Sequence, residues 1–68
     1  MKVISPVEGI VQMFYADDGT QVAHGDRLIG VESMKTTIDA ISPGNGRLRL
    51  ICHLGAYVRR SQVLAEVL

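Results

Sequence analysis

The hydrophobic positions of the chain fall into short runs that predict β-strands. The runs are rich in β-branched residues and alternate in part with polar positions, which is the pattern of half-buried strands. No window of about ten residues keeps the period of an amphipathic helix, so we expect almost no helix. The predicted strands are Ile10–Tyr15, Leu28–Glu32, Leu48–Cys52 and Val63–Val67.

The gaps between these runs have the chemistry of tight turns. Gly and Asn tolerate positive φ, and an Asp side chain can bond its own backbone. The predicted turns are Asp17–Gly19, His24–Asp26 and Pro43–Gly46. His24 lies inside the second turn, and we interpret it as a turn residue in preference to a metal ligand.

The chain contains two copies of one pattern. Ile4-Ser5-Pro6 recurs as Ile41-Ser42-Pro43, 37 residues later. Two copies are too few for a solenoid, which needs about three repeats. We therefore expect one pseudo-twofold domain over 1–68, with half-repeats of about 1–34 and 37–68. Its fold class is all-β, a flattened barrel or sandwich of two antiparallel four-stranded sheets. Further matched pairs are Gly9 with Gly46, Gly19 with Gly55, Val22 with Val58, Leu28 with Leu64 and Val31 with Val67.

Composition excludes several classes of function. The 68 residues are 47% hydrophobic and carry seven basic and seven acidic side chains. A core of this size rarely leaves more than about 3–5 kcal/mol of net stability, so there is little structure for a walled active site and we expect a non-catalytic domain. Zero net charge without a basic patch disfavours nucleic acid as a partner.

The cysteine and the N-terminal residues indicate a compartment. Cys52 is the single thiol, so it forms no internal disulfide, and with His24 and His53 it does not complete a tetrahedral zinc site. Cys52 and His53 are adjacent on a predicted strand, so we expect their side chains on opposite faces. The N-terminal stretch is interrupted at Pro6 and is too short for a signal peptide or a membrane span. We expect a cytoplasmic protein with no membrane partner.

The junction between the two copies breaks a local rule. Glu32 ends a predicted strand and Thr36 begins a segment of strand propensity, which leaves Met34-Lys35 as a two-residue turn. Such turns take type I′ or II′ geometry and prefer Asn-Gly, Asp-Gly or Gly-X. Met-Lys in such a turn strains the backbone, and strain of this kind persists where function selects it. We therefore expect a functional hairpin at 33–36 that exposes the amine of Lys35.

The motif Glu32-Ser33-Met34-Lys35, centred between repeats that each start Ile-Ser-Pro, resembles the attachment hairpin of the biotinyl/lipoyl carrier domain family. The resemblance covers the chain from Ile4 to Leu68. It implies that a ligase acylates Lys35 and that the carrier then shuttles the cofactor between active sites of partner proteins. Met before the lysine is typical of the biotin branch, whereas lipoyl domains usually carry Asp there. Thr36 departs from the biotin pattern, in which a second Met is usual.

The resemblance also implies a cofactor and partners. The cofactor is biotin, in amide linkage to Lys35, with lipoate as the alternative. The partners are a biotin protein ligase, recognising Glu32 and Met34, and biotin carboxylase and carboxyltransferase components. The segment from Asp17 to Val22 leaves no room for the protruding loop of some acetyl-CoA carboxylase carriers, which indicates the thumbless group. An isolated carrier is expected to be monomeric.

Elimination also favours Lys35, since Lys2 is the only other lysine and lies beside the chain end. The ordinary alternatives are a solvated turn lysine at 35, a core methionine at 34 and an edge-strand charge at Glu32. Three functions remain open: a biotin carboxyl carrier, a lipoyl carrier of acyl or methylamine groups, and an unmodified structural module of the same fold.

Overall fold

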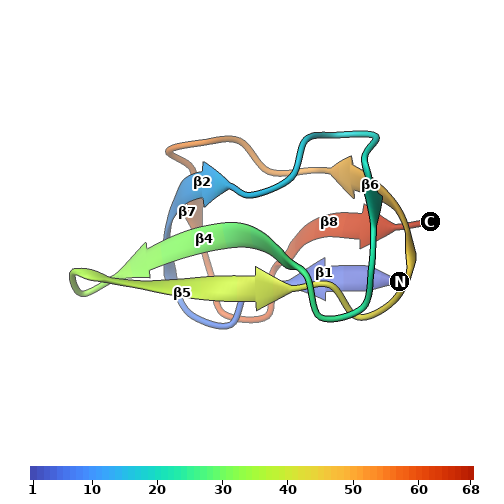
Figure 1. The fold of residues 1–68 in the computed structure, drawn as a ribbon. Helices are drawn as coiled ribbons and strands as arrows, with labels where there is room; N and C mark the ends of the chain where they lie inside the picture. The colour runs from blue at the N-terminus through green and yellow to red at the C-terminus, as the bar shows by residue number, and fades with distance from the viewer.

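Eight strands and the turns between them make up the computed structural model, which describes all 68 residues. They form two four-stranded antiparallel sheets with no helix, which confirms the predicted all-β fold (Figure 1). No helix long and apolar enough to cross a membrane is present. The strands are β1 Lys2–Ile4, β2 Gly9–Phe14, β3 Gln21–Val22, β4 Arg27–Ser33, β5 Thr36–Ile41, β6 Gly46–Leu50, β7 Tyr57–Val58 and β8 Val63–Val67.

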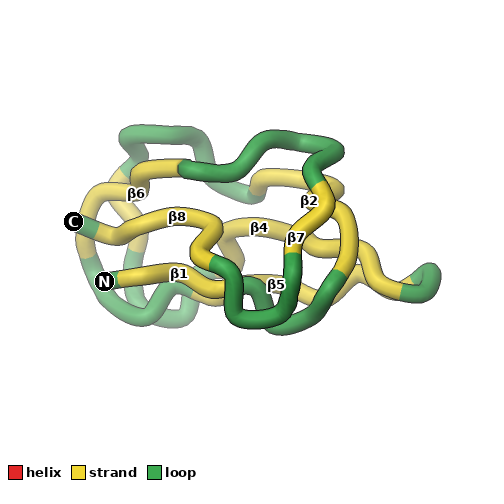
Figure 2. Tube along the Cα trace, turned by 180° about the vertical axis from the view of Figure 1, so that it is seen from behind, coloured by secondary structure: helices red, strands yellow, loops and turns green.

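The strand order shows how the two halves interlock. One sheet has the order β1-β8-β6-β3 and the other β5-β4-β2-β7. Exchanging β1 with β5, β2 with β6, β3 with β7 and β4 with β8 converts one sheet into the other, as the expected pseudo-twofold requires. Each sheet takes strands from both halves, so neither half completes a sheet alone. The two sheets form two layers, and the β4–β5 hairpin extends beyond them at one end (Figure 2).

The core lies between the two sheets and consists of the inward positions of the alternating strands. Side chains on successive strand residues point to opposite faces, so one face of each sheet supplies the core. The 12 buried hydrophobic residues form one cluster. They are Val3, Val11, Val22, Leu28, Ile29, Val31, Ala40, Leu48, Val58, Leu64, Ala65 and Val67.

The repeated Ile-Ser-Pro sequence has a structural cause in its serine. Ser5 and Ser42 are buried polar residues. The Ser5 hydroxyl donates to the carbonyl of Val7 at 2.6 Å, and the Ser42 hydroxyl donates to the carbonyl of Gly44 at 2.7 Å. A buried hydroxyl costs free energy unless it is hydrogen-bonded. The repeat thus preserves a satisfied turn at symmetric places in the fold.

The segment after β6 corrects one expectation. The predicted strand Leu48–Cys52 ends at Leu50, and the next two amides both donate to the carbonyl of Leu64, from Ile51 at 2.9 Å and from Cys52 at 3.1 Å. Cys52 and His53 are therefore not strand neighbours, and the opposite-face argument made for them was wrong. Because two successive amides donate to one carbonyl, the chain bends here and the strand ends. The apolar run Leu48–Cys52 did not predict this contact with β8.

One pair of symmetric turns differs in backbone strain and yields a stability prediction. Ser61 has φ 70° and Gly25, at the equivalent place, has φ 91°. Their amides make equivalent bonds, from Ser61 to the carbonyl of Ser5 at 2.8 Å and from Gly25 to that of Ser42 at 2.9 Å. A non-glycine residue at positive φ destabilises the folded state by about 1–2 kcal/mol. Glycine removes that strain, but the greater conformational entropy that it gives the unfolded chain offsets about 0.5–1 kcal/mol of the gain. We expect Ser61→Gly to raise the free energy of unfolding by about 0.5–1 kcal/mol in urea titrations.

The matched control for that substitution is Gly25→Ser, which places the strained residue in the other half. It should lower the free energy of unfolding by about the same amount, 0.5–1 kcal/mol. If both substitutions destabilise the chain, the Ser61 hydroxyl has a structural role that outweighs its backbone strain.

Candidate functional site: the hairpin between β4 and β5

Residues 34 and 35 form the two-residue turn that joins β4 to β5. The strands pair antiparallel up to Ser33 opposite Thr36. Met34 has φ 51° and Lys35 has φ 67°, so both turn residues occupy the left-handed region, as a type I′ turn requires. Each costs about 1–2 kcal/mol relative to glycine at the same place. The predicted departure from ordinary turn chemistry is therefore confirmed.

The side chains of this turn face solvent. Met34 is 95% exposed, which excludes its interpretation as a core methionine. Lys35 is also exposed. The chain has two ion pairs, Arg27–Asp39 and Arg49–Glu66, and Lys35 takes part in neither. The hairpin projects from one end of the molecule, while both chain termini lie at the other end (Figure 1). The amine of Lys35 is therefore available to a partner from several directions.

Glu32 lies on the outer face of the sheet, three residues before the lysine. It is opposite Ile10 of β2 and Thr37 of β5, so β4 is an inner strand of its sheet. The interpretation of Glu32 as an edge-strand charge was wrong, because β2 and β5 pair with β4 on both sides, and the order of strands in a sheet is not visible in the sequence. Glu32 is exposed and belongs to neither ion pair.

A shallow groove lies beside the hairpin, between its base and the start of β2. Glu32, Met34 and Lys35, the three residues singled out from the sequence, all line it. The remaining lining residues are Glu8, Gly9, Ile10, Ser33 and Tyr57. Sequence reasoning missed Glu8, Ile10 and Tyr57, because β7 is a two-residue strand and only its pairing with β2 brings Tyr57 to this place.

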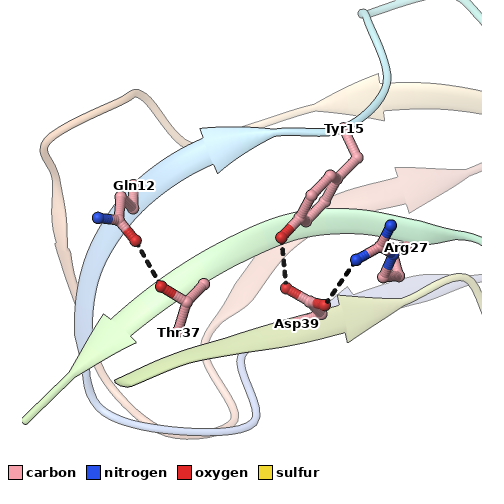
Figure 3. A network of polar contacts seen from close by, with 5 residues as sticks. All are labelled: Gln12, Tyr15, Arg27, Thr37 and Asp39. Atoms are coloured by element: carbon pink, nitrogen blue, oxygen red, sulfur yellow. Dashed lines mark hydrogen bonds and ion pairs between the residues drawn. The ribbon is translucent and has the colours of Figure 1, made fainter. Parts of the chain in front are cut away.

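Two side-chain hydrogen bonds connect β5 to β2 and to Tyr15, the residue that follows β2 (Figure 3). The Thr37 hydroxyl donates to Oε1 of Gln12 at 2.6 Å, and the Tyr15 hydroxyl donates to Oδ1 of Asp39 at 2.8 Å. The Arg27 guanidinium lies 3.8 Å from Oδ2 of Asp39 and 4.8 Å from the centre of the Tyr15 ring. Because β4 separates β2 from β5, these contacts reach across it.

A glycine in β4 allows this crossing. Gly30 is opposite Met13 on one side and Asp39 on the other. A Cβ at Gly30 would lie 3.0 Å from Cγ of Met13, 3.0 Å from Cγ2 of Thr37 and 3.3 Å from the Tyr15 hydroxyl. Because Gly30 has no side chain, side chains of β2 and β5 can meet above it. The strands of the hairpin are thus held by these hydrogen bonds, whereas its tip makes no such contact.

The Tyr15–Asp39 hydrogen bond gives a pH prediction. The bond raises the pKa of Tyr15 above its ordinary value, with desolvation and the Asp39 charge acting in the same direction and Arg27 opposing them. A raised pKa favours the protonated form in the folded state, so this stabilisation is present below the unfolded pKa and is lost as the pH rises through the folded value. Ultraviolet absorbance titration should show a tyrosine step above the ordinary range that Tyr15→Phe removes. A step unchanged in that variant would contradict the assignment.

The other residues considered from the sequence lie apart from the hairpin chemistry. The His24 amide donates to Oδ1 of Asn45 at 2.8 Å, as part of the predicted turn. Cys52 is half-buried, and desolvation raises the pKa of its thiol. Arg59 and Arg60 are exposed in the turn after β7. No group of three or more His, Cys, Asp or Glu side chains is placed to hold a metal ion.

Comparison with protein families assigns the chain. The biotin/lipoyl family model, described as biotin-requiring enzyme, matches residues 2–67. The chain therefore belongs to the biotin/lipoyl attachment domain family, in agreement with the resemblance of the Glu32–Lys35 motif.

Comparison with solved structures supports the fold. Urea carboxylase from Kluyveromyces lactis matches with a TM-score of 0.93 and 23% identity, over 100% of this chain and 6% of that one. A single-chain, multi-domain long-chain acyl-CoA carboxylase matches with a TM-score of 0.83 and 22% identity, over 94% of this chain and 6% of that one. The chain thus spans only a small part of these carboxylases.

The same fold also occurs in a different class of protein. A succinylglutamate desuccinylase/aspartoacylase from Rhodobacter sphaeroides matches with a TM-score of 0.75 and 17% identity, over 97% of this chain and 21% of that one. At such identities the likeness concerns the fold alone.

Proposed function

We propose that the chain is a thumbless biotin carboxyl carrier domain. Biotin is attached through an amide bond to Lys35, and the domain moves carboxyl groups between biotin carboxylase and carboxyltransferase sites. The observation that carries the proposal is the strained, solvent-exposed Met34-Lys35 turn in a chain of the biotin-requiring family. Residues 1–68 act as one carrier unit, with halves 1–34 and 37–68 and the attachment hairpin at 33–36.

The two lysines differ in ways that favour Lys35 as the attachment residue. Lys2 lies in β1 opposite Glu66, beside the chain terminus and away from the hairpin end (Figure 1). Lys35 lies at the projecting tip of the β4–β5 hairpin, where its side chain is exposed to a partner protein. Glu32 and Met34 flank it as exposed side chains, and we propose both as recognition residues for a biotin protein ligase.

The residues at the tip fit a covalently attached group. The Lys35 amine takes part in neither ion pair of the chain, so acylation would break no ion pair. When bound, biotin supplies a ureido nitrogen that carries the carboxyl group. The chain itself supplies an anchored, movable arm, and tethering of this kind raises the local concentration of a group to about the millimolar range. We propose a carrier role without catalysis, in the cytoplasm.

Two other functions compete with this one. A lipoyl carrier would use the same lysine, and Met34 in place of the usual Asp argues against it. An unmodified structural module would have the same fold, which also occurs within an aspartoacylase-family protein. Such a module has no need of two non-glycine residues at positive φ in an exposed turn, and that strain argues for modification.

Acylation with purified ligases tests the proposal directly. The chain is incubated with a biotin protein ligase and, in parallel, with a lipoate ligase, and each product is mapped by peptide mass spectrometry. We expect a biotin increment on Lys35 and no increment on Lys2. A lipoyl increment on Lys35 would establish the lipoyl alternative, and an unmodified chain in both reactions would establish the structural module.

The branch assignment gives a prediction for Met34. Met34→Asp should lower the initial rate of biotin incorporation by at least about tenfold, equivalent to 1.4 kcal/mol of lost recognition, and should increase lipoyl incorporation. The side chain is almost fully exposed, so the fold should be unaffected. Met34→Leu is the matched control and should keep most of the rate. Unchanged biotin incorporation in Met34→Asp would remove Met34 as a specificity residue.

A further inference from the structure

The groove beside the hairpin contains residues that attachment does not require. It is a shallow, widely open depression with a volume of about 630 Å³. Ligand sites commonly have volumes of about 300–1,000 Å³, with apolar walls and a few polar groups. Glu8, Ile10 and Tyr57 line this groove together with the hairpin itself. The groove therefore has room for a small ring system next to the attachment residue.

The apolar part of the groove is a row of side chains across three strands. Tyr57 of β7 is opposite Ile10 of β2, and Ile10 is opposite Glu32 of β4. Residues directly opposite on antiparallel strands share a face, with Cβ atoms about 4.5–5.5 Å apart. Tyr57 is 55% exposed and Ile10 is 39% exposed, so both present apolar surface to solvent. The row forms a platform that ends at the carboxylate of Glu32.

The polar lining of the groove includes two carboxylates, beside Ser33 and Lys35. Glu8 and Glu32 both line it, and neither takes part in an ion pair. An ionised carboxylate only accepts hydrogen bonds, so each requires a donor from a partner or from water. A ligand with N–H donors on an otherwise apolar ring matches this combination of surfaces.

The arm on Lys35 can reach this platform. Lys35 is three residues from Glu32, so an extended chain would separate them by at most about 10 Å, and the turn at 34–35 brings them nearer. The four-carbon lysine stem, lengthened by the acyl chain of the cofactor, spans that distance. Because the ring is tethered, its local concentration is about millimolar, and weak contacts are enough to populate a docked state.

We propose that this groove is a docking site for the cofactor ring carried by Lys35, an inference that rests on the proposed biotin attachment. The apolar bicyclic ring lies on Ile10 and Tyr57, and the ureido N–H groups donate to the carboxylates of Glu8 and Glu32. Such charge-assisted bonds are the stronger class of hydrogen bond. The dithiolane ring of lipoate has no N–H donor, so the same groove prefers biotin.

Amide spectra of the ¹⁵N-labelled chain test this docking. The chain is loaded with a biotin ligase, the increment on Lys35 is confirmed by mass, and spectra of the loaded and unloaded forms are compared. We expect chemical-shift changes at Ile10 and Tyr57 as well as at residues 33–37. Changes confined to 33–37 in the loaded chain would overturn the docking site and leave the attachment intact.

Matched substitutions separate docking from general effects. Tyr57→Ala and Glu8→Ala should each reduce the shift change at Ile10 by at least half. Leu54→Ala removes an exposed hydrophobic side chain outside the groove and should leave the change as it was. Equal effects of Leu54→Ala and Tyr57→Ala would contradict a specific site.

A ligase-independent arm distinguishes failure of docking from failure of the proposed function. If the ligase adds nothing to Lys35, a Lys35→Cys, Cys52→Ser chain is coupled to a biotin maleimide, which places the ring at the same residue. Shift changes at Ile10 and Tyr57 in that sample would support the groove although enzymatic attachment had failed. Their absence would overturn the groove as well.

Discussion

Replacement of Lys35 by arginine should reduce biotin incorporation to background while the fold stays intact. Arginine keeps the positive charge, but its guanidinium remains protonated in proteins and cannot serve as the acyl acceptor. The residue is exposed and belongs to neither ion pair. Surface substitutions of this kind change stability by about 0.5 kcal/mol or less. Incorporation is measured with a purified ligase, and folding by circular dichroism during urea unfolding.

The chain offers a matched control in its other lysine. Lys2→Arg makes the same chemical change at the opposite end of the molecule (Figure 1) and should keep the full incorporation rate. If biotin incorporation persists in Lys35→Arg and disappears in Lys2→Arg, the attachment residue is Lys2. Unfolding of Lys35→Arg would show that Lys35 is a structural residue.

The second large effect is expected from Gly9→Ala. A Cβ at Gly9 would collide with the backbone carbonyl of Glu32, and it would also lie 3.2 Å from Cγ1 of Val31. Backbone cannot rotate aside as a side chain can, so β2 and β4 must separate. Overpacking of this kind costs about 3 kcal/mol, which is most of the net stability of a domain of this size. The urea midpoint should fall by more than half, with a matching loss of biotin incorporation.

Gly44→Ala is the control for that effect. Its Cβ would meet only Sδ and Cε of Met1, at the end of a flexible side chain that can move. We expect a change of about 0.5 kcal/mol or less in the free energy of unfolding. Similar losses for the two substitutions would show that steric contact with the β4 backbone does not explain the role of Gly9.

The main features of the fold were predictable because the sequence contains two copies of the same pattern. The Ile-Ser-Pro repeat marks symmetric buried serines, and the glycine pair Gly9 and Gly46 marks symmetric close approaches, to the backbone of Glu32 and of Leu68. The short strands were not predictable. β3 and β7 have two residues each and form because they pair with β6 and β2. Two residues are too few to show an alternating pattern from which a strand could be predicted.

The strained hairpin at 33–36 was predictable and the groove beside it was not. Met34-Lys35 violates the local preferences of a two-residue turn, and a violation is visible in sequence. Tyr57 and Glu8, in contrast, reach the hairpin only through strand pairing and the path of the chain before β2. The bracing contacts of Tyr15 with Asp39 and of Thr37 with Gln12 likewise join residues 24 and 25 positions apart.

The most direct test of the account is the intact mass of the chain purified from cells with active biotin and lipoate ligases, with peptide mapping of Lys35. The account predicts one biotin-sized increment, located on Lys35 and absent from Lys2. A lipoyl-sized increment on Lys35 or a fully unmodified chain would contradict the biotin carrier function, and a biotin increment on Lys2 would contradict the assignment of the hairpin.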